Sequence, residues 1–98
     1  MYAYSAYTES VRFQYDPAKA VSNLRKHGVS FADAEGVFYD PLAIHRLEPD
    51  SIDEERFVAV GMGSAGEILV VIYTLRDEEI RIISARHATR HEVKSYEN

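Results

Sequence analysis

The sequence contains no cysteine and no tryptophan, and it has only five glycines and three prolines among 98 residues. Without cysteine the chain can form neither a disulfide nor a thiolate metal site, which favours the reducing cytoplasm as its location. Its longest apolar run, Ile68 to Tyr73, has the length of a strand, whereas a membrane-spanning helix needs ~20 apolar residues. The N-terminus lacks a basic segment followed by an apolar one, so we expect no secretory signal.

Several catalytic and cofactor motifs are also missing. No serine or threonine stands in a Gly-x-Ser-x-Gly elbow, and there is no Walker loop. Gly61-Met62-Gly63 lacks a third glycine and a following helix, so it does not predict a dinucleotide site. We therefore expect no cofactor, and any chemistry has to come from other polar side chains.

Charge is distributed unevenly along the chain, whose formal net charge is −5. Acidic residues gather between Glu48 and Glu55, whereas Arg81, Arg86 and Arg90 make the C-terminal part basic. A negative protein repels nucleic acid as a whole, but clustered cations still allow a local anion site. The alternative is that both charged segments are ordinary solvated surface.

Periodicity and capping residues divide most of the chain into helices and strands. Asp16 and Pro17 predict the start of a first helix, and Gly28 predicts its end. The predicted order is β-α-α-β-β-β-β-α, typical of an α+β fold. The elements are a strand over 11–15, helices over 17–27 and 31–39, strands over 42–47, 56–62, 68–75 and 79–85, and a helix over 90–96. We expect residues 1–10 to form a flexible extension of a single domain spanning 11–98.

Side-chain alternation predicts which faces are buried. In the first helix, Ala20, Val21 and Leu24 form a narrow apolar stripe. In the last strand, strict alternation puts Ser84 on the face that the helices cover and Ala85 on the open face.

Three arginines around the last strand could bind a phosphate. Alternation turns Arg81 toward the open face, away from Ile80 and Ile82, while Arg86 follows the strand and Arg76 precedes it. Guanidinium groups match the oxygens of a phosphate. Alternatively, each arginine pairs with a nearby carboxylate, for which the candidates are Glu67, Asp77, Glu78 and Glu79.

Histidines provide two further candidates. Lys26 and His27 end the first helix, where the helix dipole alone favours cations, but His27 could also transfer protons and Lys26 could hold phosphate. His87 and His91 are four residues apart, so on a helix they could bind zinc or nickel with a third ligand. A capping box at Thr89 places His87 before the final helix, and we therefore expect no metal.

Several of these segments together resemble the BrnT family of bacterial toxins, which are small ribonucleases related in fold to RelE. The resemblance runs from about Val11 to Tyr96. Its strongest segments are Phe13 to Phe31, the Asp40-Pro41 step, Glu54-Glu55-Arg56, Leu69 to Thr74 and Ile80 to Arg86.

The resemblance implies a RelE-like fold with a curved antiparallel sheet and helices on one face. It also implies RNA cleavage that inhibits translation, and neutralisation by a BrnA-type antitoxin. That antitoxin binds DNA, so the toxin would meet DNA only through it, in a complex that could be a hetero-tetramer. The chain departs from the family pattern at Tyr15, where tryptophan is common, and at Asp77-Glu78-Glu79, where a glycine often follows the arginine.

The implied reaction needs no metal, because the RNA 2′-hydroxyl attacks its own phosphate and the 5′-oxygen leaves. The protein must stabilise charge on the phosphorane and move protons. We assign charge stabilisation to the three arginines around the last strand, Arg76, Arg81 and Arg86, and acid–base catalysis to His27. Contact with the RNA backbone is assigned to Lys26, Arg56 and Arg90.

Two other functions are compatible with the sequence. A RelE-like chain that has lost catalysis could act only in antitoxin pairing and operon regulation, and it would bind antitoxin without cutting RNA. A metal-dependent hydrolase could use the histidines, and EDTA would abolish its activity.

Overall fold

The computed structural model describes residues 11–50 and 54–98, and the predicted N-terminal extension lies outside these residues. The element order is the predicted one, with a short 3-10 turn prolonging the second helix. The elements are β1 (Phe13–Gln14), α1 (Pro17–His27), α2 (Phe31–Glu35), η2 (Gly36–Tyr39), β2 (Ile44–Leu47), β3 (Phe57–Met62), β4 (Ile68–Arg76), β5 (Glu79–His87) and α3 (Arg90–Glu97). None of the described helices is long and apolar enough to cross a membrane.

The caps that the sequence predicts are present at the helix ends. The Asp16 side chain accepts a hydrogen bond from the backbone N–H of Ala18, and Gly28 ends α1 at a φ of 71°, which favours glycine. Thr89 and Glu92 form a reciprocal capping box at the start of α3. Local chemistry therefore determines where α1 and α3 begin.

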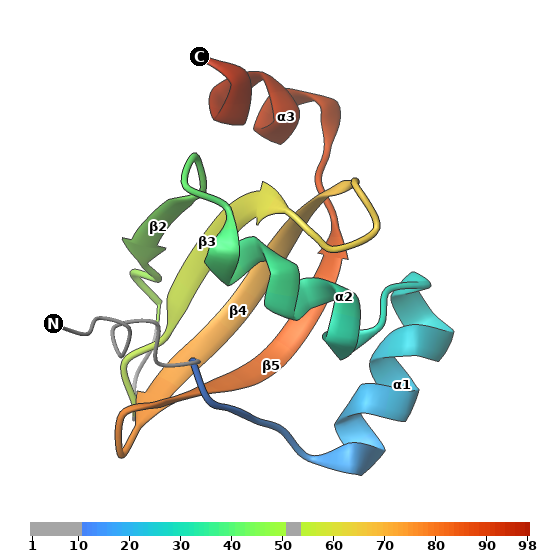
Figure 1. Cartoon of the computed structure of the whole chain (residues 1–98), viewed down its shortest axis with the longest axis vertical. Helices are drawn as coiled ribbons and strands as arrows, with labels where there is room; N and C mark the ends of the chain where they lie inside the picture. The colour runs from blue at the N-terminus through green and yellow to red at the C-terminus, as the bar shows by residue number, and fades with distance from the viewer. Residues whose placement is uncertain (1–10, 51–53) are drawn as a thin grey trace, which may run out of the picture.

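The strands form one sheet in the order β1-β5-β4-β3-β2. Strands β2 to β5 form the expected antiparallel meander, since each pairs with the next along the chain (Figure 1). The sequence analysis did not anticipate that β1 pairs in parallel with β5, with Phe13 opposite Ile80. This short strand covers only the beginning of the outer edge of β5.

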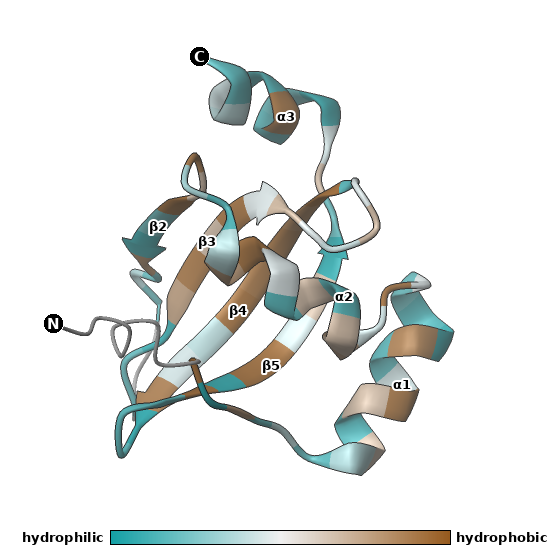
Figure 2. Cartoon of the chain, viewed as in Figure 1, coloured by the Kyte–Doolittle hydropathy of each residue, from teal (hydrophilic) through white to brown (hydrophobic). Residues whose placement is uncertain are grey.

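Helices α1 and α2 lie on one side of the sheet (Figure 1), and the main core lies between α2 and the central strands. Phe31, Ala34 and Val37 pack there against apolar side chains such as Val71 and Ile82. Hydrophobic residues run along the central strands β3 and β4 (Figure 2). Burial of these side chains stabilises the sheet and fixes the face on which α2 lies.

The C-terminal helix α3 departs from the expected placement of helices on one face. Its Tyr96 packs against a smaller cluster, Val58, Val60 and Val70, on the opposite face of the sheet. The Tyr96 hydroxyl also donates a hydrogen bond of 2.6 Å to Asp40. The opposite face is thus covered by α3 at one end and free of α1 and α2.

The pairing of β4 with β5 contains a bulge. Ile72 lies opposite Ser84 and Tyr73 lies opposite Ile82, so Ile83 is an extra residue in β5. The predicted strict alternation is therefore wrong beyond Ile82: Ala85 is fully buried in the core, and Ser84 turns to the opposite face. The reason is physical, because a single inserted residue exchanges the two faces of every residue that follows it.

Candidate functional site

The face of the sheet opposite α1 and α2, called the open face below, carries arginines from β2, β4 and β5. Residues that pair across two strands point to the same face. Three arginines pair with residues of the open face: Arg46 with Val58, Arg81 with Thr74, and Arg86 with Val70. Without the bulge, Arg81 and Arg86 would point to opposite sides of the sheet. The bulge brings both guanidiniums to one face, which supports the prediction that they act together.

Arg76 is paired with a carboxylate that was not among its predicted partners. Its Nε and Nη2 atoms donate to the Glu54 carboxylate at 2.9 and 3.5 Å, and both side chains are about half exposed. The hydrogen bond from Arg76 holds the pKa of Glu54 below its usual value, and the charges of Arg81 and Arg56 act in the same direction. Of the predicted site arginines, Arg76 therefore bonds this carboxylate directly, and Arg81 and Arg56 act on it only through their charge.

Arg81 has a different environment. Its Nη1 donates to the Gln14 side-chain oxygen at 3.3 Å, and the Gln14 amide nitrogen donates to Glu79 at 2.8 Å. Within the described residues Arg81 forms no ion pair. Its positive charge is therefore oriented by a neutral amide and available to an anion on the open face.

Arg86 is held by a bidentate ion pair at the other end of β5. Its two terminal nitrogens donate to the Glu92 carboxylate at 2.8 and 2.9 Å, which fastens α3 to the sheet. This pair lowers the pKa of Glu92 to about 2 and raises that of Arg86. Arg90 lies exposed in the first turn of α3, away from the Glu54 group of arginines.

Lys26 and His27 lie at the end of α1, as predicted, in a groove between α1 and β5. The groove has a volume of about 170 Å³ and is lined by Lys19, Ser22, Asn23, Lys26, His27, Ile83 and Ser84. Within residues 11–50 and 54–98, neither Lys19 nor Lys26 forms an ion pair. The groove thus offers two unneutralised ammonium groups and one imidazole.

The orientation of α1 splits the predicted apolar stripe: Ala20 packs against the core, but the other two residues face solvent. Val21 and Leu24 are 56% and 51% exposed, whereas Asn23 is only 7% exposed. The Asn23 amide nitrogen donates to the carbonyl oxygens of Ala85 and Val29, and its oxygen accepts from the Ala85 N–H. Because β1 pairs only with Ile80 and Arg81, Ala85 has no strand neighbour on the outer edge of β5, and the Asn23 carboxamide replaces one.

The sequence contained a signal for this groove that the analysis missed. Lys19, Ser22, Asn23 and Lys26 recur at helical spacing, so they form a polar stripe as regular as the apolar one. Ser84 was placed on the wrong face, since the bulge has no mark in the sequence. Ser84 in fact lines the groove. It also lies on the open face, because it pairs with Ile72 across the β4–β5 ladder.

Ser84 is therefore where the groove and the open face meet. Along β5 it lies between Arg81 and Arg86, and His27 of α1 lines the same groove. An anion bound at Ser84 would be flanked by guanidiniums on the strand and by a lysine and a histidine from the helix. This arrangement can stabilise negative charge and can exchange a proton at the same place.

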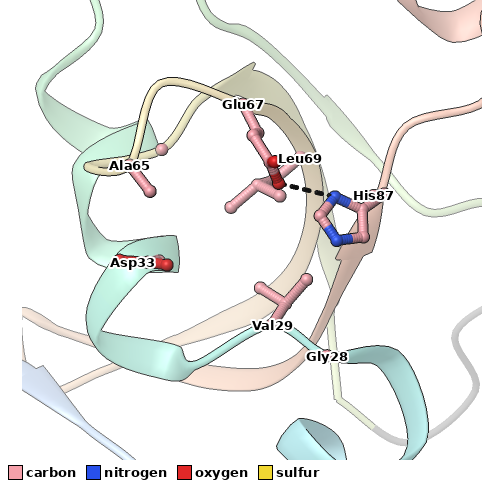
Figure 3. A pocket seen from close by; sticks show the side chains of 8 residues that line it. Gly28, Val29, Asp33, Ala65, Glu67, Leu69 and His87 are labelled. Atoms are coloured by element: carbon pink, nitrogen blue, oxygen red, sulfur yellow. Dashed lines mark ion pairs between the residues drawn. The ribbon is translucent and has the colours of Figure 1, made fainter.

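The other histidines form no metal site in the described part of the chain. His87 belongs to β5 rather than to a helix, so the helical spacing to His91 does not apply. Its Nδ1 atom lies 3.0 Å from a Glu67 oxygen, and Figure 3 shows this pair beside a pocket of about 20 Å³, with Asp33 across from it. Among the described residues, no three histidine, aspartate or glutamate side chains are close enough to hold a metal ion.

Comparison with known proteins connects this fold to a family. Residues 15–92 match the family model described as the ribonuclease toxin, BrnT, of type II toxin–antitoxin systems. The 1.1 Å crystal structure of the ribonuclease toxin BrnT from Brucella abortus matches with a TM-score of 0.61 at 27% sequence identity, covering 83% of this chain and 100% of that one. No curated protein sequence matches at a significant level.

Proposed function

The chain belongs to the BrnT family of ribonuclease toxins of type II toxin–antitoxin systems, and we propose that it cleaves RNA where the α1 groove meets the open face. One observation carries the proposal: the bulge at Ile83 puts Arg81 and Arg86 on the same face as Ser84, and Ser84 lines the α1 groove together with His27. Groups for charge stabilisation and proton transfer, which the reaction requires, therefore lie on both sides of Ser84.

The proposed reaction is an internal transfer of the phosphoryl group. The 2′-oxygen attacks the adjacent phosphorus, the bond from phosphorus to the 5′-oxygen breaks, and a 2′,3′-cyclic phosphate and a 5′-hydroxyl result. Arg81 stabilises the negative charge that develops on the phosphorane oxygens. His27 exchanges a proton with the attacking or leaving oxygen, since histidine is the side chain best suited to proton exchange near neutral pH.

The remaining predicted residues act on binding. Lys26, together with Lys19, neutralises the phosphate in the groove, and Arg86 does so once Glu92 has released it. Arg56 and Arg76 contact the RNA backbone at the end of the open face where β4 and β5 are joined. Arg90 extends this contact along α3.

Family membership implies an antitoxin partner. We expect a DNA-binding antitoxin of the BrnA type, so that this chain reaches DNA only as part of the complex, for instance as a hetero-tetramer. Cleavage of RNA in the cytoplasm would then inhibit translation whenever the antitoxin is lost.

The direct test is digestion of a labelled RNA by purified chain, with His27→Ala, Arg81→Ala and Lys94→Ala variants. We expect the rate to fall about 100-fold or more for the first two, from typical losses of acid–base and charge-stabilising groups. Lys94→Ala changes an exposed cation on α3 and should cut at the normal rate. EDTA should leave the rate unchanged, and a loss would favour the metal-dependent alternative.

The residue assignment is wrong if His27→Ala and Arg81→Ala both cut RNA like the unmodified chain. A chain that binds its antitoxin tightly and cuts no RNA under any condition would instead be a non-catalytic module.

A further inference from the structure

The carboxylate of Glu54 lies where a polyanion would be expected to bind. It accepts hydrogen bonds from Arg76, and the charges of Arg81 and Arg56 also stabilise its ionised form. Guanidiniums bind carboxylate and phosphate oxygens with the same geometry. A protein carboxylate that holds Arg76 in this way therefore has the chemistry of a stand-in for phosphate.

Thr74 provides a second, independent observation at this place. It lies opposite Arg81 in the β4–β5 ladder, two residues before Arg76, and it is 0% exposed. Its hydroxyl oxygen has no hydrogen-bond partner in the described structure. A buried hydroxyl without a partner is unfavourable and uncommon. Because Thr74 has no exposed surface, its hydroxyl can bond an oxygen from outside only once the groups that cover it have moved.

We infer that Arg76, Arg81 and Thr74, called the Glu54 cradle below, form a binding site for a phosphodiester group, and that Glu54 occupies this site until nucleic acid displaces it. The register separates Thr74 from Ile72, the partner of Ser84, by two residues of β4, which corresponds to roughly 7 Å. The cradle is therefore a subsite next to the phosphate position proposed at Ser84. That the displacing strand is RNA rests on the proposed function; the phosphodiester site itself does not.

Displacement of Glu54 is energetically accessible. Both members of the Arg76–Glu54 pair are about half exposed, and exposed ion pairs are weak. Such a pair reduces the affinity for a competing anion by a factor of about two to five. Glu54 thus lowers the affinity for stray anions without closing the site to a strand that binds at several points.

The test measures binding of a fluorescein-labelled hexanucleotide whose riboses are 2′-O-methylated, so that it cannot be cleaved. Glu54→Gln should tighten binding about two- to fivefold at low salt. Glu55→Gln is the matched control, because it removes the same charge from the next residue, which is exposed and is not paired with an arginine in the described chain. Its affinity should change by clearly less.

Two further variants locate the effect in the cradle. Arg76→Ala in the Glu54→Gln background should remove the gain in affinity. Thr74→Val keeps the shape of the side chain and removes the unpaired hydroxyl, so it should fold at least as well but bind the hexanucleotide more weakly. Thermal unfolding of each variant by circular dichroism excludes loss of fold as the cause.

The inference is overturned if Glu54→Gln and Glu55→Gln tighten binding equally, since the effect would then be general electrostatics. It is also overturned if Glu54→Gln weakens binding in a folded protein. A specific gain with Glu54→Gln in a chain that cuts no RNA would support the cradle and contradict the nuclease function. If the chain cuts RNA but Glu54→Gln and Glu55→Gln change the affinity for the hexanucleotide equally, the nuclease function would be supported and the cradle contradicted.

Discussion

Replacement of Asn23 by aspartate tests whether one carboxamide holds α1 against the edge of β5. Asn23 donates to two carbonyl oxygens, those of Ala85 and Val29, at 2.8 and 3.0 Å, and accepts from the Ala85 N–H at 3.1 Å. Aspartate has nearly the same shape and keeps the acceptor. It cannot donate when ionised, so its second oxygen would face two carbonyl oxygens in a buried position.

The size of the effect follows from these contacts. Each lost hydrogen bond contributes about 1 kcal/mol, and a buried acceptor left without a partner costs about 1–3 kcal/mol. We therefore expect Asn23→Asp to lower the free energy of unfolding by roughly 3 kcal/mol at neutral pH. For a domain of this size that corresponds to a fall in Tm of roughly 12 to 24 °C.

The dependence on pH distinguishes this mechanism from a simple packing defect. Burial and the facing carbonyl oxygens should raise the pKa of the new aspartate in the folded state above its unfolded value of about 3.9. The folded state then binds more protons than the unfolded state between these two pKa values, so the deficit relative to the unmodified chain grows as pH rises through that window. Below it, the protonated side chain regains one donor and the deficit is smallest.

Urea unfolding followed by circular dichroism at about pH 4, 5.5 and 7 measures both effects. The unmodified chain corrects for other carboxyl groups, and Ser22→Ala, an exposed neighbour on α1, is the control. The reasoning is refuted if Asn23→Asp costs no more than Ser22→Ala at neutral pH. A deficit that stays constant on acidification would refute the hydrogen-bond account.

Four other changes test the remaining features of the fold. Glu92→Gln should cost about 1 kcal/mol at neutral pH, because the partly exposed pair with Arg86 loses its charge. Because that pair holds the folded pKa of Glu92 at about 2, its contribution is full above the unfolded pKa of about 4.3 and is lost as pH falls toward 2, so the variant and the unmodified chain should converge there in urea titrations. Leu24→Ala should cost less than about 1 kcal/mol and Val37→Ala about 2 kcal/mol, since only Val37 is buried; equal costs would contradict the observed orientation of α1. Deletion of Ile83 removes only the extra residue of the bulge, so Ala85 should stay in the core and Arg86 on the open face, and the variant should still cut RNA; loss of cleavage with an unchanged Tm would show that the Ile83 side chain itself is needed.

Local signals in the sequence predicted the elements well. Asp16 and Gly28 mark the ends of α1, and Thr89 marks the start of α3, because each side chain or backbone conformation acts within four residues of its own position. The meander from β2 to β5 also follows from sequence, since short connections join consecutive antiparallel strands. These interactions join residues that are close in sequence, so they can be predicted from the sequence alone.

The orientation of α1 and the position of the bulge could not be predicted, because they depend on residues that are far apart in the sequence. The exposed apolar stripe of α1 is as regular as its polar stripe, and the choice between them depends on the unpaired backbone of Ala85, which is 62 residues from Asn23. Ile83 is a good strand residue, so nothing in its own chemistry marks it as the bulge. Its position follows from the pairing of β4 with β5 as a whole.

The same distinction applies to the arginines of the site. The partner of Arg86, Glu92, is six residues away and that of Arg76, Glu54, is 22 residues away, and neither was among the predicted carboxylates. Both carboxylates reduce the charge that these arginines present, and among the three predicted catalytic arginines only Arg81 has no ion pair within the described residues. Of these three arginines, a chain with a net charge of −5 therefore leaves Arg81 without a carboxylate partner and holds Arg76 and Arg86 in ion pairs. Nucleic acid that binds first at Arg81 is then placed to compete with Glu54 and Glu92 for the other two.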